Sequence, residues 1–278
     1  MGRTRKSRVV VAEDRPLTPE EAEAAAAAAA YAASEADYAY YAEEEETGET
    51  APAPSLAEAI AALEVCGDAT RAEAAAAYHK VARRYLGVPV PLIEDMARLW
   101  REACTLEERI ALARGLWASD IHEAKIAAAK LLTQARMRPD DAAWELICDW
   151  VDGFDAWAIA DHAASAGARR LSADPARLDR VEGWLGAENM WTRRAALVMT
   201  LPFTKQNHPT PAEAAARARV LEWCVRLAPE RDWFIQKAIG WWLRELSKHD
   251  PEAVANWLAA HGETLKAFAR KEASKRLG

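Results

Sequence analysis

Apolar residues from position 55 onward recur every three or four positions, in stretches of about 10–20 residues. This spacing is typical of helices that bury one face. Alternating runs of Val, Ile and Thr are rare, and short breaks separate the stretches. Several breaks, such as Asp174-Pro175 and Asp250-Pro251, are signals for the start of a helix. The pattern predicts an all-α protein of roughly a dozen helices joined by short connections.

Short connections make consecutive helices antiparallel neighbours, and many such pairs in series form an α-solenoid. The pairs have only faint sequence similarity to one another, so we expect HEAT-like repeats without a recognisable repeat code. A solenoid of this kind has a concave face large enough for a nucleic acid duplex.

The first 54 residues have a different pattern. The motif TPEE at residues 18–21 predicts a helix start, and an Ala-rich stretch follows it. The acidic run EEEETGETAPAPS then has the composition of a linker. We therefore expect an acidic, partly disordered arm and linker over residues 1–54, and a helical-repeat domain over residues 55–278.

Charge is distributed unevenly between these regions. The chain has a formal net charge of −7, and residues 1–54 contain 5 basic and 12 acidic residues. The remaining residues balance, with 31 of each sign, but from Trp191 onward 15 basic residues exceed 9 acidic ones. A basic C-terminal third suits a polyanionic partner, although a solvated surface explains the same bias equally well.

Cysteine usage and hydropathy limit the remaining possibilities. The four cysteines include no CxxC pair, and His122-Glu123 lacks the second histidine of an HExxH zinc motif. No apolar run reaches the length of a membrane span, and the basic N-terminus lacks the apolar core of a signal peptide. We expect a cytoplasmic, monomeric protein with no cofactor, metal or membrane partner.

One candidate for chemistry is the segment DAWAIADH at residues 155–162. Trp157 and Asp161 lie four residues apart and so share a helix face. A carboxylate on an otherwise apolar face costs free energy unless it is paired or faces water. Taken alone, the two fit a core tryptophan and a surface aspartate. Asp155, which could cap the same helix, is a rival carboxylate.

Two further segments combine tryptophan with basic residues. In NMWTRRAAL, Arg193 and Arg194 follow a tryptophan at a predicted helix start. In FIQKAIGWWLREL, Lys237, Trp241 and Arg244 fall on one helix face. The tryptophans that we expect to serve packing are Trp184, Trp223, Trp242 and Trp257.

Together, FIQKAIGWWLREL, NMWTRRAAL and WAIAD resemble the AlkD-like DNA alkylation repair family of HEAT-like repeat DNA glycosylases. KEASK near the C-terminus and Tyr78-His79-Lys80, which precedes YLGVP, are also similar to that family. The resemblance extends from about Ser55 to the end of the chain. Two positions depart from it: His162 follows Asp161 where small residues are usual, and Pro202 stands near an expected basic residue.

The resemblance implies a monofunctional DNA glycosylase that hydrolyses the N-glycosidic bond of cationic alkylated purines, such as N3-methyladenine and N7-methylguanine. The partner is double-stranded DNA that contains alkylated bases. Asp161 matches the catalytic aspartate, and Trp157 and Trp241 match tryptophans that flank the sugar and backbone of the lesion. Arg194 matches an arginine that holds the phosphate backbone, and Tyr78 matches a tyrosine on the opposite wall. The full set of expected DNA contacts is Tyr78, Arg193, Arg194, Lys205, Lys237 and Arg244.

Elementary chemistry agrees with these roles, since a fixed carboxylate can stabilise a sugar cation and orient water. We expect Asp161 to be an unpaired cleft carboxylate whose removal leaves folding intact. Two alternatives stay open: a solenoid that binds DNA without excision, and a helical scaffold for protein partners.

Overall fold

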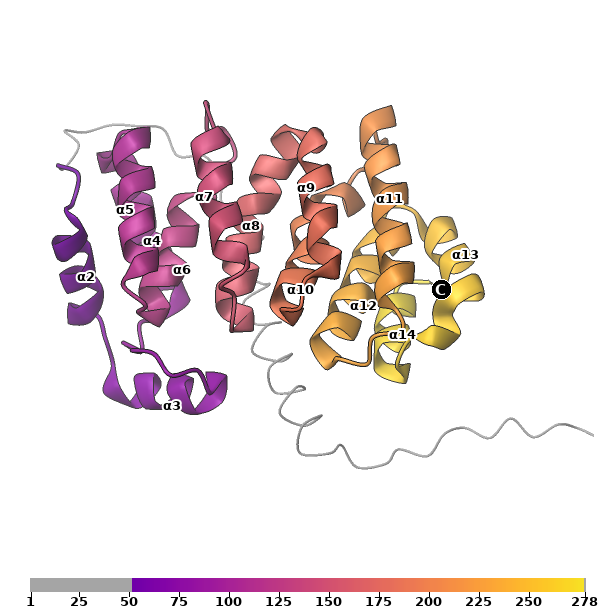
Figure 1. Cartoon of the computed structure of the whole chain (residues 1–278), viewed down its shortest axis with the longest axis horizontal. Helices are drawn as coiled ribbons and strands as arrows, with labels where there is room; N and C mark the ends of the chain where they lie inside the picture. The colour runs from indigo at the N-terminus through magenta and orange to yellow at the C-terminus, as the bar shows by residue number, and fades with distance from the viewer. Residues whose placement is uncertain (1–51, 278) are drawn as a thin grey trace, which may run out of the picture. The chain divides into compact units, whose positions relative to one another are not determined.

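The helices of the structure, which is a computed structural model, follow the predicted periodicity closely (Figure 1). The structure describes residues 52–277, and within that range it has thirteen α-helices and no β-strand. The backbone comes closest to a strand where Arg84 and Ile121 form an isolated bridge. Residues 1–51 of the expected arm and linker (1–54) lie outside the described residues. The prediction of an all-α fold is confirmed.

The α-helices are α2 (Leu56–Val65), α3 (Ala69–His79), α4 (Val90–Ala103), α5 (Leu106–Ala118), α6 (His122–Leu131), α7 (Asp141–Val151), α8 (Trp157–Ala173), α9 (Leu178–Gly183), α10 (Met190–Met199), α11 (Pro211–Leu227), α12 (Trp233–Ser247), α13 (Pro251–His261) and α14 (Ala267–Ser274). Four short 3-10 helices connect some of them: η1 (Pro175–Arg177), η2 (Trp184–Gly186), η3 (Leu201–Thr204) and η4 (Gly262–Thr264).

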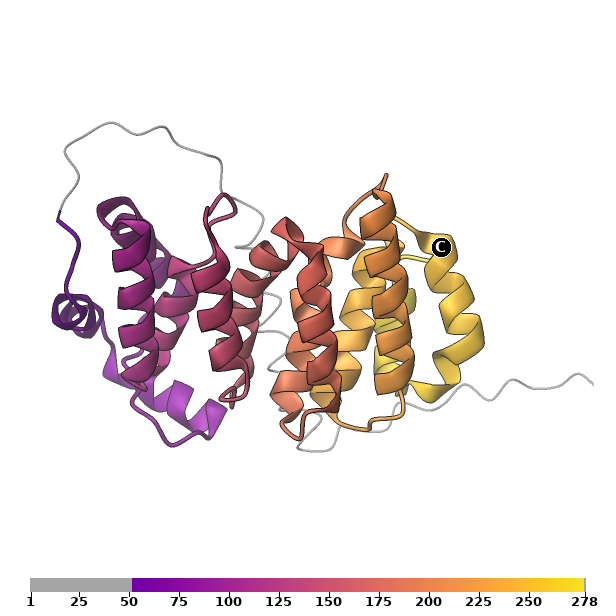
Figure 2. The same cartoon turned by 45° about the horizontal axis from the view of Figure 1, so that its top comes forward.

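The helices of residues 52–277 form two rows (Figure 1; Figure 2). In the first row α4, α6, α8, α10, α12 and α14 each pack against the next. In the second row α5 packs on α6, α7 on α8, α11 on α10 and α12, and α13 on α12 and α14. This arrangement of stacked helix pairs is the predicted α-solenoid, and α8 and α10 occupy the middle of its first row.

Side-chain caps set the start of the helices that matter for the site. Asn189 accepts a hydrogen bond from the backbone N–H of Trp191 at 2.9 Å, which begins α10. Asp232 accepts one from the N–H of Phe234 at 2.8 Å, which begins α12. Such caps satisfy backbone donors that the first helical turn leaves unpaired. The caps thereby fix where the arginines and tryptophans of both helices lie.

The core contains the tryptophans that the sequence assigned to packing. Trp223 and Trp242 are fully enclosed, and Trp242 donates its indole N–H to the Thr200 hydroxyl at 3.2 Å. Trp257 is also buried, while Trp184 is partly buried and lies beside Trp144, with ring centroids 6.3 Å apart and planes tilted by 32°. These four predictions are confirmed.

Gly240 on α12 marks a close contact with the last helix. A Cβ atom added there would lie 2.9 Å from the carbonyl oxygen of Ala269 and 3.3 Å from its Cα. Both atoms belong to the backbone of α14, so no side-chain rotation can relieve the contact. The glycine therefore allows α14 to lie directly against α12, one residue before Trp241.

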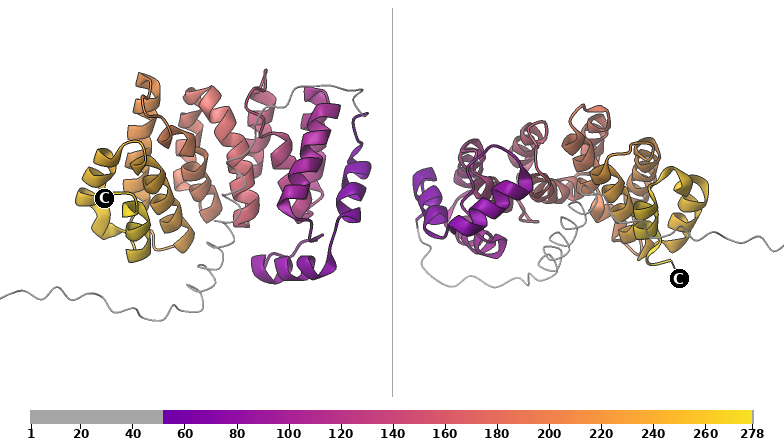
Figure 3. Two further views of the ribbon diagram at one scale, coloured as in Figure 1. Left: turned by 180° about the vertical axis from the view of Figure 1, so that it is seen from behind. Right: turned by 90° about the horizontal axis from the view of Figure 1, so that it is seen from below.

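Helix α3 is held differently from its neighbours. It runs across the ends of nearby helices and has no buried residue (Figure 3). The loop that follows it is anchored firmly, because the buried carboxylate of Glu123 accepts the backbone N–H groups of Leu86 at 2.9 Å and Gly87 at 2.7 Å. The attachment of α3 itself therefore depends on its two ends.

None of the helices in residues 52–277 is long and apolar enough to cross a lipid bilayer.

Candidate active site

Asp161 lies one helical turn after Trp157, the first residue of α8. Its carboxylate accepts two hydrogen bonds from Arg194, Nε to Oδ1 at 3.1 Å and Nη2 to Oδ2 at 2.8 Å. The side chains are 8% and 3% exposed, respectively. The expectation of an unpaired cleft carboxylate is therefore wrong. The physical reason is that a buried carboxylate requires a compensating charge, and the packing of α10 on α8 supplies one.

Arg194 also reaches a third helix. Its Nη1 donates to the carbonyl oxygen of Phe234, in the first turn of α12, at 2.9 Å. Its guanidinium carbon also lies 5.9 Å from the centre of the Phe234 ring. All three guanidinium nitrogens thus have partners on α8 and α12. The sequence presented Arg194 as a phosphate contact, but in this structure the side chain joins three adjacent helices of the first row.

The aromatic residues expected around Asp161 come from three helices. Trp157 is half-buried and meets Tyr78 of α3 edge to face, with ring centroids 6.4 Å apart and planes at 85°. Trp241 is also half-buried, about 100° around the axis of α12 from the enclosed Trp242. The resemblance implied that Tyr78 lies on the wall opposite the tryptophans, and in the structure its ring is next to that of Trp157.

Asp155, the rival carboxylate, is engaged elsewhere. It forms an ion pair with Arg83, whose side chain is only 3% exposed, from the loop after α3. The N-cap residue of α8 is Ala156, and no side chain caps that helix. The expectation that Asp155 caps the helix is wrong, because its carboxylate turns toward the buried arginine instead.

His162, the departure from the family pattern beside Asp161, points into the core. Its side chain is buried, and burial lowers its pKa well below the ordinary value, with further lowering by the charges of Lys130 and His122. Adjacent residues on a helix face different directions, so a buried neutral imidazole fits behind Asp161 without entering the cleft.

The other expected DNA contacts differ in exposure, and two of them form ion pairs with glutamates. Arg193 donates to Glu230 through Nε at 3.0 Å and Nη2 at 2.8 Å, and through Nη1 to two backbone carbonyls, so its assignment as a DNA contact is not supported by its geometry. Arg244 pairs with Glu245 and Glu272. Lys237 is half-exposed and Lys205 exposed.

The structure also reveals a cluster that sequence reasoning missed. The rings of His79, Tyr85 and His122 pack together, with centroids 4.5 Å apart for the two histidines and 4.9 Å apart for Tyr85 and His122. His79 also lies 5.9 Å from Trp157. Burial and the Arg83 charge lower the pKa of His79 to about 4, and burial with nearby positive charge lowers that of His122 to about 3. The recurrence of aromatic residues and histidine at residues 78–85 was the available signal.

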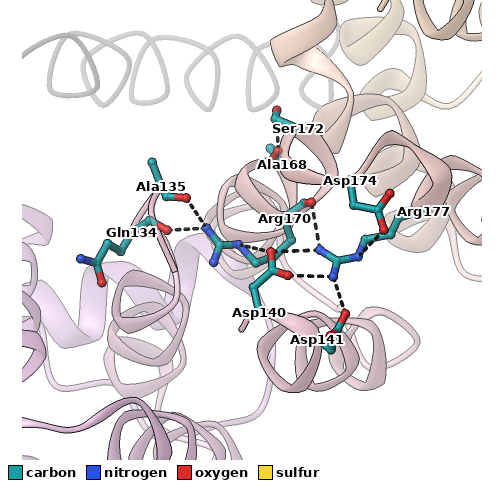
Figure 4. Close-up of polar contacts among 9 residues, drawn as sticks. All are labelled: Gln134, Ala135, Asp140, Asp141, Ala168, Arg170, Ser172, Asp174 and Arg177. Atoms are coloured by element: carbon teal, nitrogen blue, oxygen red, sulfur yellow. Dashed lines mark hydrogen bonds and ion pairs between the residues drawn. The ribbon is translucent and has the colours of Figure 1, made fainter. Parts of the chain in front are cut away.

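A second Asp–Arg cluster lies toward the other end of α8 (Figure 4). Asp140 accepts hydrogen bonds from Arg177 at 2.8 and 3.0 Å, and Arg177 donates to Asp141 at 2.8 Å. Arg170 of α8 is fully buried, lies 3.6 Å from Asp140, and donates to the carbonyls of residues 134 and 135. This cluster fastens the loop before α7 to the end of α8.

No group of three or more side chains with metal-binding chemistry occurs among residues 52–277. The candidate site in this part of the chain consists of the Asp161–Arg194 pair and the half-buried rings of Trp157, Tyr78 and Trp241.

Comparison with known proteins agrees with the architecture. A structure described as a predicted DNA alkylation repair enzyme from Enterococcus faecalis superposes with a TM-score of 0.64 at 22% identity, covering 76% of this chain and 97% of that one. AlkD2 from Streptococcus mutans superposes with a TM-score of 0.54 at 18% identity, covering 80% and 98%. At these identities the likeness establishes the fold alone.

No curated protein matched the sequence. The model of the DNA alkylation repair enzyme family, however, matches residues 59–277, which is most of the chain and includes every residue of the candidate site. With its row of paired helices, this chain belongs to the DNA alkylation repair enzyme family.

Proposed function

We propose that this protein is a monofunctional DNA glycosylase that releases cationic alkylated purines, such as N3-methyladenine and N7-methylguanine, from duplex DNA. The observation that carries the proposal is the Asp161 carboxylate, fixed by two hydrogen bonds from Arg194 one helical turn from Trp157. Family membership supports a repair enzyme. The Asp161 position adds a candidate for the group that acts on the sugar.

Alkylation of a ring nitrogen makes the purine a good leaving group before any enzyme acts. When the bond between C1′ and the base nitrogen breaks, its electron pair moves to the base and cancels the positive charge there. Positive charge then develops on the sugar. A carboxylate beside C1′ stabilises that charge, and it can accept a hydrogen bond from the water whose oxygen attacks C1′. The water proton passes to the carboxylate or to solvent.

Arg194 serves this reaction by fixing the direction of the carboxylate. A bidentate arginine–carboxylate pair holds both oxygen atoms in one plane. Each oxygen of Asp161 retains a second lone pair beyond its bond to the arginine. Those lone pairs are the ones available to a water or a sugar. Arg194 is in this account a positioning residue, and the phosphate contacts fall to other side chains.

The tryptophan rings shape the environment of the Asp161 carboxylate and of the lesion. Indole faces attract positive charge, and the effect strengthens when water is excluded. Trp157 and Trp241 are both half-buried, so each has a surface available to a nucleotide. Lys237 and Lys205 are the basic side chains we assign to DNA phosphates, since such contacts position a duplex without reading its sequence.

A second candidate function is a solenoid that binds DNA without excision. The pairing of Asp161 with Arg194 favours it, because a carboxylate neutralised by a buried arginine presents less negative charge to a sugar. The two functions differ in one measurable property, the release of a free base.

The test is single-turnover base release from duplexes that contain N7-methylguanine or N3-methyladenine, with an unmodified duplex as reference. We expect release by the wild-type protein. Asp161→Asn should reduce the rate by on the order of 10²–10³, the usual loss for one preorganised electrostatic group. Asp140→Asn is the matched control, because it removes the charge of another arginine-paired carboxylate, at the start of α7, and should leave the rate within about threefold.

Both variants lose a buried charge partner, so rates are compared well below their melting temperatures and per folded molecule. DNA binding by the wild type without base release would favour the non-catalytic solenoid. Equal losses in Asp161→Asn and Asp140→Asn would show that folding, not chemistry, explains the effect.

A further inference from the structure

Helix α3 carries Tyr78, one wall of the proposed cleft, yet none of its residues is buried. A helix that buries no apolar face gains little stability from packing. Its start is held where Asp68 donates its backbone N–H to the Leu86 carbonyl at 2.8 Å. Gly87, at φ 76°, makes room for that approach, since a Cβ there would meet the Asp68 carbonyl oxygen. The position of Tyr78, at the far end of α3, needs a separate explanation.

His79 supplies the contacts at that far end. Its ring lies 4.5 Å from His122 of α6, 5.9 Å from Trp157 of α8, and 6.1 Å from the parallel ring of Tyr85. It also meets Tyr78 edge to face at 5.0 Å. One side chain thus touches four rings from three helices and the following loop, at the point where α3 meets the first row.

We propose that His79 is a positioning residue of the cleft, joining the end of α3 to α6 and α8 and so determining where Tyr78 stands opposite Trp157. Ring pairs of this kind stabilise a structure beyond the area that they bury. Several such contacts at one residue are enough to order the end of a helix that has little other burial. The role of this alignment in base release rests on the proposed function.

The charges around His79 agree with a packing role. Arg83 lies beside the cluster of rings around His79. It forms an ion pair with Asp155 and lies 3.5 Å from Asp120. Glu123, at the start of α6, is occupied by backbone N–H groups. Burial and the neighbouring charge of Arg83 both lower the pKa of His79, so the imidazole is neutral and acts as an aromatic ring.

The experiment compares His79→Ala, which removes the ring, with His79→Phe, which keeps it. His208→Ala is the control, because His208 is exposed and lies outside the cluster. Hydrogen–deuterium exchange on the full-length protein should show residues 70–80 exchanging roughly tenfold faster in His79→Ala. Exchange in α10 should not change, and His79→Phe and His208→Ala should match the wild type.

Single-turnover base release adds the functional readout. His79→Ala should lower the maximal rate roughly ten- to hundred-fold, because small displacements of a positioning group have effects of that size. The half-saturating protein concentration should change less than about threefold, since phosphate contacts remain. His79→Phe should restore the rate to within about threefold of the wild type.

Wild-type protection of residues 70–80 in His79→Ala would overturn the proposal. So would wild-type base release by that variant, or a His79→Phe variant as impaired as His79→Ala. If the wild type releases no base, the proposed function fails, but the exchange comparison still decides whether His79 holds α3.

Discussion

Helix α8 takes part in two buried aspartate–arginine clusters, and their surroundings differ. Asp140 lies among several charges: Arg177 binds it with two hydrogen bonds, and Arg170 lies 3.6 Å away (Figure 4). Asp161 has one ion pair among the described residues, with Arg194, and one helical turn away stands Trp157. Asp140, which has several charged partners, suits a purely structural contact between helices. Asp161, which has one arginine partner and an aromatic neighbour, can form a further contact.

The largest expected difference between the clusters is in base release when each carboxylate is moved without loss of charge. Asp161→Glu lengthens the side chain by one methylene and displaces the carboxylate by more than 1 Å. We expect single-turnover base release to fall by about 10²-fold, because near-attack geometry is lost. Asp140→Glu should leave the rate within about threefold. Similar losses in both variants would remove the functional distinction between the clusters.

Stability should separate the clusters next. Arg194→Ala leaves the buried Asp161 carboxylate without its ion-pair partner, so the free energy of unfolding should fall by roughly 3–5 kcal/mol. Arg177→Ala should cost less, about 1–3 kcal/mol, because Arg170 still faces Asp140. Urea denaturation gives both values.

The double variant Asp161→Ala/Arg194→Ala is the control for this interpretation. Removing both charges should restore part of the stability lost in Arg194→Ala, since no uncompensated ion stays buried. A double variant that is less stable than Arg194→Ala would contradict it.

The two regions should also respond to acid in different pH ranges. The pKa of His79 is lowered to about 4 and that of His122 to about 3, against 6.5 in the unfolded chain. Between pH 6.5 and about 4 the unfolded chain therefore binds more protons than the folded one, and stability falls as the pH falls. The buried His162, whose pKa is also lowered, adds to this trend.

Asp140 acts in the same direction but in a lower pH range. Hydrogen bonds from Arg177 hold its pKa below the ordinary value of 3.8, so its stabilising contribution is present above that pH and is lost below it. Melting temperatures measured across pH 3–8 report this decline in stability. Between pH 6.5 and 4, the free energy of unfolding of His79→Phe should fall by roughly 1–2 kcal/mol less than that of the wild type. Asp140→Asn should alter only the decline below about pH 4. Identical profiles for the two variants would mean that neither group titrates as described.

The smallest expected effect concerns DNA binding. Lys237→Ala should reduce the slope of log K against log salt concentration by about one, the value for one lost phosphate contact. Arg193→Ala is the control, because its guanidinium is engaged by Glu230 and by backbone carbonyls. Fluorescence anisotropy with an unmodified duplex at several salt concentrations measures both slopes. A loss of slope in the Arg193 variant alone would reverse the assignment.

Helix periodicity made the fold predictable, because the burial pattern of a helix repeats within a few residues of sequence. The same local geometry placed Trp157 and Asp161 together, since a four-residue separation fixes a shared face. Predictions from the apolar stripe of a single helix were therefore successful, whereas the expected cap by Asp155 failed because Arg83, a residue outside that helix, pairs with it. The packing of Trp223 and Trp242 belongs to the successful class, because each lies on the apolar stripe of its own helix.

The partners of Asp161 and Arg194 could not be predicted in this way. They lie 33 residues apart, and their pairing depends on how α8 and α10 align. Arg193 and Arg194 are adjacent and differ by about 100° around the helix axis, so one reaches Asp161 and the other Glu230. The sequence alone does not say which arginine pairs with which carboxylate. The contact of His79 with Trp157 could not be predicted for the same reason, because it joins distant segments of the chain.

The contact at Gly240 has a consequence for the making of the protein. Gly240, the residue before Trp241, lies directly against the backbone of Ala269 in α14. The position of α12 therefore depends in part on its packing against α14. While a ribosome is still adding α14, the residues around Asp161 have already been synthesised, but α12, which carries Trp241, still lacks its most extensive helix contact. A chain released early, or cut by a protease before Ala267, would keep the Asp161 carboxylate. It would lose the packing that holds α12 and, with it, Trp241 of the proposed aromatic wall. Translation of α14 is thus the step that completes the packing of α12.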